Sequence, residues 1–147
     1  MSPPRPPCAG GWNADGKGES VWDHFVHTRP VFGGGTGDVT CDSYHRIAQD
    51  MVILNGIGLS YYRFSISWSR IFPKGDPRLS SGPNEPGVRY YNDLINNLTS
   101  AGIQPMVTLF HWDLPQVTTR NAKPLSNPSI HSSTHSLTYP FTHSLTH

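Results

Sequence analysis

The sequence predicts an α/β fold in which parallel strands alternate with helices. Two stretches have apolar residues three and four positions apart, which is typical of helices, and a strand-length run rich in aromatic and β-branched residues follows each one. Short turns join each helix to its strand, an order typical of βαβ units with right-handed crossovers. The chain has 147 residues, fewer than the roughly 250 that a closed barrel of eight such units takes. It can therefore hold only part of such a barrel.

The first helix is expected between Asp42, a candidate N-cap, and Gly58, a left-handed stop. Its apolar positions follow the helical period: Tyr44, Ile47, Ala48, Met51, Leu54 and Ile57. Leu59–Ser67 is expected as the first strand, because this run combines aromatic residues with a β-branched residue at strand length.

A loop rich in Pro, Gly and Ser is expected over Phe72–Gly87. The second helix follows, with apolar positions at Val88, Tyr91, Leu94, Ile95, Leu98 and Ala101. Gly102 is expected to end this helix, and Ile103–Phe110 is expected as the second strand. Strands joined in this way should be parallel and buried.

The folded part is expected over residues 9–116, which hold all ten acidic residues and all four tryptophans. Residues 1–8 are rich in proline, which removes backbone donors, so they are expected to be disordered. Residues 117–147 form a low-complexity Ser/Thr/His tail without Asp or Glu, in which Thr134–Thr138 is repeated as Thr142–Thr146. Disorder is expected there too, because such a segment buries too little apolar surface to offset its ordering entropy.

Composition argues against several classes of partner. The formal net charge is +1 and the 11 Lys and Arg residues are scattered, so no nucleic-acid surface is expected. No run approaches the roughly 18 apolar residues of a membrane span, and the Pro-rich start lacks the apolar centre of a secretory signal. The chain as written is therefore expected in the cytoplasm. Cys8 and Cys41 have no disulfide-framework or zinc spacing, and no metal is expected.

Functional groups of parallel α/β folds gather where the strands end at their carboxyl edge. Those positions hold Trp68 after the first strand and His111, Trp112 and Asp113 after the second. An imidazole, an indole and a carboxylate in succession suit sugar recognition, because rings cover C–H faces while polar groups bind hydroxyls; plain packing is the alternative. Arg63 either reaches solvent from the strand end or is buried. A buried guanidinium needs a carboxylate partner, and Arg63 would then orient an active-site carboxylate.

Four blocks of the sequence resemble glycoside hydrolase family 1 in their order and spacing. They are GGWNADGKG at 10–18, SVWD at 20–23, YYRFSISWSRIFP at 61–73 and PMVTLFHWDLPQ at 105–116. The resemblance covers about residues 9–116, and its details are most similar to the animal lactase and cytosolic β-glucosidase group. It implies an α/β fold that is a partial (β/α)8 TIM barrel, made of roughly the first two or three β/α units.

Enzymes of this family hydrolyse the O-glycosyl bonds of β-glucosides or β-galactosides with retention, using two glutamates about 5 Å apart and no cofactor. For this chain the resemblance implies that His111 contacts sugar hydroxyls and that Trp112 lies in the same wall. Arg63 matches the arginine that lies beside the family's nucleophile and orients it. The implied partner is a β-glycoside substrate of a parent enzyme, and a lactase-like parent would be extracellular.

The departures from the family concern the catalytic residues. The family's acid/base lies in an Asn-Glu-Pro motif and its nucleophile in a Glu-Asn-Gly motif, and neither follows the PMVTLFHWDLPQ block here. Asn84-Glu85-Pro86 spells the first motif, but it lies upstream, in the loop expected before the second helix, and is interpreted as a coincidence. We therefore expect a truncated N-terminal fragment of a retaining β-glycosidase, without catalytic residues and inactive by itself. The alternative is a non-enzymatic sugar-binding or interaction fragment.

Overall fold

The computed structural model describes residues 10–29, 36–79, 82–121 and 138–140. Its sheet has the strand order β1-β2-β3. β1 (Tyr61–Ser65) and β2 (Gln104–Thr108) are parallel, and they pair in register from Tyr61 opposite Gln104 to Ser65 opposite Thr108. The predicted α/β fold with parallel strands is confirmed. Both strands are shorter at each end than predicted, because the flanking residues lie in the turns.

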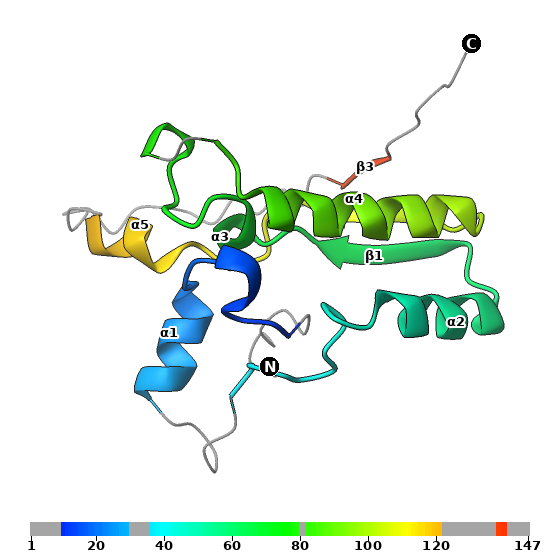
Figure 1. Cartoon of the computed structure of the whole chain (residues 1–147), viewed down its shortest axis with the longest axis horizontal. Coiled ribbons are helices and arrows are strands. Elements are labelled where there is room, and N and C mark those ends of the chain that lie inside the picture. Colours follow the sequence, from blue (N-terminus) through cyan, green and yellow to red (C-terminus); the bar gives the residue numbers. More distant parts are fainter. Residues whose placement is uncertain (1–9, 30–35, 80–81, 122–137, 141–147) are drawn as a thin grey trace.

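Helix α4 (Glu85–Ser100) lies in the crossover between the two strands and runs alongside them (Figure 1). It begins three residues before Val88, the first position of the predicted helix, because proline is accepted in a first helical turn and Pro86 stands there. Glu85 and Pro86 are therefore helical, which corrects their predicted place in a loop. The helix ends as expected, with Ala101 as C-cap and Gly102 at a φ of +74°.

Helix α2 (Ile47–Ile57) ends at Gly58, whose φ of +72° makes it the predicted left-handed stop. The predicted start was wrong. Asp42 has a φ of +54°, and its carboxylate contacts His45 Nδ1 at 2.6 Å, so residues 42–46 form a separate tight turn. Arg46 is the N-cap residue and makes no side-chain cap hydrogen bond. The helical spacing of apolar residues begins at Tyr44, but this residue lies in a turn that the Asp42 carboxylate stabilises. The spacing alone therefore placed the helix start too early.

The first part of the chain packs across the ends of the strands. It contains the 3-10 helix η1 (Ala14–Gly16) and helix α1 (Val21–Thr28), which begins with a capping box between Ser20 and Asp23. After β1 come the short helix α3 (Trp68–Ile71) and the 3-10 helix η2 (Pro77–Leu79). Among the described residues, no helix combines the length and apolar character needed to cross a membrane.

Two stretches of regular structure lie in or next to the segment predicted as a disordered tail. Helix α5 (Gln116–Asn121) follows the strand-end turn, and β3 (Thr138–Pro140) pairs antiparallel with β2. The structure differs from the prediction at these residues. The remainder of the tail and the Pro-rich start lie outside the described residues.

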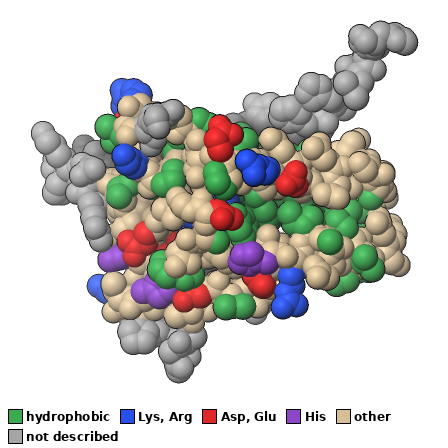
Figure 2. Space-filling model, viewed as in Figure 1, with side chains coloured by type: hydrophobic (Ala, Val, Ile, Leu, Met, Phe, Trp, Pro, Cys, Tyr) green, Lys and Arg blue, Asp and Glu red, His purple; other side chains and the backbone are tan. Residues whose placement is uncertain are grey.

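The described core is small and lies between α2, α4 and the sheet. Its buried members are Met51, Leu94, Leu98 and Ile103. Much of α2 faces outward instead, with Val52 73% and Ile53 57% exposed. Figure 2 shows apolar side chains gathered over this end of the molecule. Within the described residues, α2 therefore has an apolar face that nothing covers.

Candidate functional site

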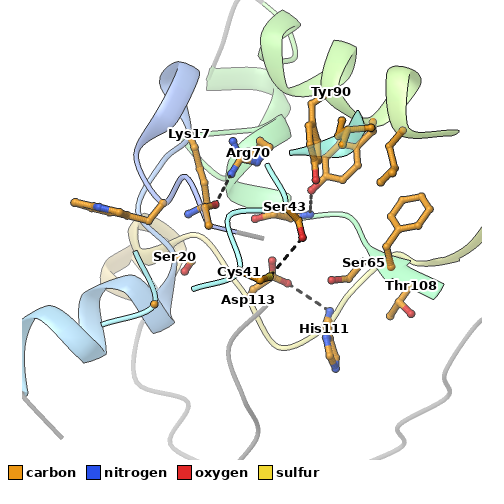
Figure 3. Close-up of a pocket in the computed structure, with 18 of the residues that line it drawn as sticks. Lys17, Ser20, Cys41, Ser43, Ser65, Arg70, Tyr90, Thr108, His111 and Asp113 are labelled. Carbon is orange, nitrogen blue, oxygen red and sulfur yellow. Dashed lines mark hydrogen bonds between the residues drawn. The ribbon is translucent and has the colours of Figure 1, made fainter. Parts of the chain in front are cut away.

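A cavity of about 430 Å³ opens where β1 and β2 end. Polar side chains from the two strand ends lie along it, and Figure 3 shows four of them close together: Ser65, Thr108, His111 and Asp113. Arg63 and Ser67 line the same cavity. The carboxyl edge of the parallel pair therefore contributes polar side chains to a cavity that apolar and aromatic residues also line.

Arg63 lines the cavity and is exposed, which is the first of the two alternatives left open by the sequence. Its Nε donates a hydrogen bond to Thr108 Oγ1 on the neighbouring strand at 3.0 Å. β1 is an edge strand in the described sheet. Arg63 and His111 line one cavity although 48 positions separate them in the sequence.

The other two predicted site residues, His111 and Trp112, lie in the strand-end turn (residues 109–115). Trp112 has a φ of +62°, a left-handed conformation that costs a non-glycine residue roughly 1–3 kcal/mol. Its side chain is 56% exposed and does not line the cavity, whereas the His111 side chain does. Trp68, the corresponding residue after β1, also lies away from the cavity, and its Nε1 donates to the Gly75 carbonyl at 3.0 Å.

The SVWD block holds this turn from the other end of the sequence. Trp22 Nε1 donates to the Trp112 carbonyl at 2.7 Å across 90 positions of sequence. The Val21 amide donates to the Leu114 carbonyl at 2.9 Å, and the Gln116 amide donates to the Glu19 carbonyl at 2.8 Å. Two of the blocks quoted above therefore meet in space. Sequence reasoning did not single out Trp22, because a lone indole gives no sign of its distant partner.

Asp113, the third residue of the predicted strand-end group, is only 1% exposed. Its Oδ1 accepts a hydrogen bond from the His111 amide at 3.4 Å (Figure 3), and its Oδ2 has no hydrogen-bond partner among the described residues. Burial raises the pKa of this carboxyl above its ordinary range. The only sequence signal was a carboxylate two positions after a histidine at a strand end.

Arg70 is a second buried charge that sequence reasoning missed. It is 2% exposed, its guanidinium lies 3.8 Å from the ring centroid of Tyr44, and its Nη2 donates to the Gly11 carbonyl at 2.9 Å. Burial, with a further contribution from the hydrogen bond to Asp15, raises the pKa of Tyr44 to about 12. Arg70 therefore ties the GGWNADGKG block to α3. Its position in the apolar run SWSRIF was the available signal.

In the part of the chain that the structure describes, no three His, Cys, Asp or Glu side chains come together as a metal site. The histidines of the repeat in residues 134–147 lie outside that part. Asp23 is one of the acidic residues that line the cavity. Its carboxylate already accepts hydrogen bonds from Lys17 Nζ at 2.6 Å and from Ser20 Oγ at 2.7 Å.

The fold and the site together define an α/β protein with a cavity at the carboxyl ends of parallel strands. The family model described as glycosyl hydrolase family 1 matches residues 8–132. The chain belongs to this family. The match extends past residue 116, where the resemblance was expected to end.

Solved structures agree with the family match. Aphid myrosinase is 49% identical, with a TM-score of 0.70 over 76% of this chain and 24% of its own. The family 1 β-glucosidase from Thermotoga maritima is 45% identical, with a TM-score of 0.70 over 76% of this chain and 25% of its own. This chain thus spans about a quarter of each solved structure.

Curated relatives include rat (Rattus norvegicus) lactase/phlorizin hydrolase, which is 54% identical over 123 residues, or 82% of this chain and 6% of the relative. Raucaffricine-O-β-D-glucosidase from Rauvolfia serpentina is 55% identical over 109 residues, or 73% of this chain and 20% of the relative. The chain is therefore similar to a small part of each of these proteins.

Proposed function

We propose that this chain is the N-terminal part of a retaining β-glycosidase barrel that acts on β-glucosides or β-galactosides. The observation that carries the proposal is the meeting of His111 and Arg63 at one cavity where two parallel strands end. His111 would contact sugar hydroxyls, and the exposed face of Trp112 would lie beside the sugar. Arg63 would lie next to the nucleophile of the complete barrel.

The chain alone should not hydrolyse glycosides. In this family retention uses two glutamates about 5 Å apart, one as acid/base and one as nucleophile. The two glutamates of the chain are Glu19 and Glu85, and neither lines the cavity. Glu19 contacts His24 Nδ1 at 3.1 Å, and Glu85 is exposed in the first turn of α4. A complete barrel would have to supply the catalytic pair.

The proposal can be tested in two arms. The purified 147-residue chain should release no more aglycone from an aryl β-glucoside than a buffer control. The second arm replaces the matching segment of the Thermotoga maritima β-glucosidase with residues 10–116, so that the barrel supplies both glutamates. This graft should hydrolyse the same substrate.

Within the graft, His111→Ala should lower kcat/KM about 10- to 100-fold, because a hydrogen bond to the sugar is lost at the reacting centre. The matched control is His45→Ala, which changes a histidine in the exposed turn before α2 and should leave kcat/KM unchanged. Turnover by the chain alone, or a folded graft in which His111→Ala is harmless, would refute the proposal.

Sugar binding without hydrolysis is the second candidate function. It is favoured by the cavity itself, in which Tyr62 and Phe64 lie next to the polar strand ends. Calorimetry of the chain with deoxynojirimycin, a compound found in complex with the Thermotoga maritima enzyme, distinguishes the two candidates. Saturable binding by the short chain, together with an inactive graft, would favour this second function.

A further inference from the structure

The strand-end turn contains a conformation that its own sequence does not favour. Trp112 lies in the left-handed region at a φ of +62°, where the side chain of an L-residue crowds its own backbone. Such a residue stays in place only when its surroundings determine its conformation. The contacts around Trp112 therefore decide how the turn presents His111.

Those contacts come from the SVWD block (residues 20–23). The Trp22 indole donates directly to the carbonyl of the left-handed residue at 2.7 Å, and Val21 donates to the carbonyl two positions later at 2.9 Å. Ser20 and Pro115 form an isolated antiparallel bridge between the same two segments. The block and the turn are thus joined at three neighbouring points.

The block is itself held firmly. Ser20 is only 4% exposed, and its hydroxyl and amide both bond to the Asp23 carboxylate, at 2.7 and 2.8 Å. Lys17 Nζ contacts the same carboxylate at 2.6 Å. Trp22 therefore lies in the first turn of a capped helix, and this position directs its indole N–H to the Trp112 carbonyl.

We propose that Trp22 is a positioning residue, whose indole N–H holds Trp112 in the left-handed conformation and so sets the placement of His111. The step from this placement to sugar recognition rests on the function proposed above. The ring of Trp22 also lies against Phe25, edge to face, with centroids 6.3 Å apart. A phenylalanine at position 22 keeps this ring contact and removes only the donor.

The test measures hydrogen exchange of the 147-residue chain by mass spectrometry at micromolar concentration. Trp22→Phe should speed exchange about tenfold in peptides covering residues 109–117, because the lost bond fixes the turn. The matched control is Trp68→Phe, which removes an indole-to-carbonyl bond of the same kind at Gly75. The control should affect residues near Gly75 and leave 109–117 unchanged. Equal exchange of 109–117 in wild type and Trp22→Phe would overturn the proposal.

A rescue variant separates positioning from general loss of structure. Glycine adopts a positive φ without steric cost, so adding Trp112→Gly to Trp22→Phe should restore slow exchange of the turn. If Trp22→Phe does not fold, the single variant Trp112→Gly still decides the question. Residues 109–117 of this variant should exchange at least as slowly as in wild type. Faster exchange would show that the contacts around residue 112 do not hold it in a disfavoured backbone conformation.

A sugar titration keeps this inference distinct from the proposed function. Deoxynojirimycin should slow exchange of residues 109–117 in wild type, and Trp22→Phe should weaken its apparent affinity at least tenfold while Trp68→Phe should not. Exchange that depends on Trp22 but not on the sugar would support the positioning role and count against sugar contact by the turn. Sugar protection that is identical in wild type and Trp22→Phe would overturn the positioning role.

Discussion

Asp113 and Arg70 are buried charges that the chain does not pair with each other or with any other charged side chain among the described residues. All ten acidic residues of the sequence lie in the described ranges, and none of their carboxylates pairs with Arg70. Backbone carbonyls and the Tyr44 ring surround its guanidinium instead. A buried ion without a counter-ion is costly, and stacking and carbonyl bonds offset only part of that cost.

The buried carboxyl of Asp113 predicts a pH dependence of stability. Burial is the largest cause of its raised pKa, against smaller lowering effects of Ser67 and the His111 amide. A raised pKa means that the folded chain binds this proton more tightly than the unfolded chain. Wild-type stability should therefore fall as the pH rises from 3.8 through the raised value.

Asp113→Asn removes this titration. Relative to wild type, the variant should gain stability across the same pH window, by about 1.4 kcal/mol for each unit by which the pKa is raised. Urea unfolding of both proteins, below the ordinary pKa and near neutrality, measures the difference. A stability difference that is the same at both pH values would contradict this account.

At the single-residue level, the strand pattern pointed to His111, which lines the cavity, and to Trp68 and Trp112, which do not. Arg63 also lines the cavity, and it was singled out by its possible burial and by the family resemblance. Trp22, Arg70 and the burial of Asp113 were missed, because they depend on contacts across the fold, such as the bond over 90 positions from Trp22 to Trp112. The exposure of Arg63 was one of two alternatives left open, since a sequence does not state which side chains a neighbouring element covers.

Among the elements, those fixed by local rules were predicted best. Helix α4 has a clear apolar stripe, and α2 ends at a glycine in the required conformation. The starts of both helices were misplaced, because Asp42 stabilises a turn of its own and Pro86 extends α4 backward. The strands of five residues each are shorter than their apolar runs, because side-chain pattern does not show where pairing stops.

Alanine substitutions at the two glycines at the end of α2 should change the stability of the chain in opposite directions. Gly58 has a φ of +72° while Gly56 is helical, and a Cβ added at either would meet nothing within 4 Å. Gly58→Ala should therefore destabilise the chain by about 1–2 kcal/mol through backbone strain alone. Gly56→Ala should stabilise it by up to about 1 kcal/mol through helix propensity.

Urea unfolding midpoints of the two alanine variants and wild type test this prediction. Each variant is the control for the other, because both add one methyl group at an open position of the same helix end. If both midpoints moved in the same direction, the positive φ of Gly58 would not be the reason why glycine is needed there.

For the whole molecule, the small core contrasts with the apolar surface left on α2. Val52 and Ile53 are both more than half exposed, and β1 has an uncovered edge among the described residues. The solved relatives are about four times as long as the matching part of this chain. A face of this kind, next to an open strand edge, is a site for association.

The chain should therefore self-associate as its concentration rises, and the double variant Val52→Glu, Ile53→Lys should reduce this. Leu79→Glu is the control, because it removes an equally exposed apolar side chain on η2, away from α2. Sedimentation velocity over a concentration series measures the effect. A monomeric wild type at all concentrations, or an equal effect of Leu79→Glu, would contradict the assignment to α2.

The seating of Trp22 against Trp112 also has a consequence for the order of folding. The indole meets its acceptor only after 90 further positions of chain are present, whereas α2 and β1 are neighbours in sequence and can associate early. Closing so long a loop costs entropy that local pairs do not pay. During synthesis on the ribosome, the start of this polypeptide must therefore wait for β2 and its turn to emerge before it docks.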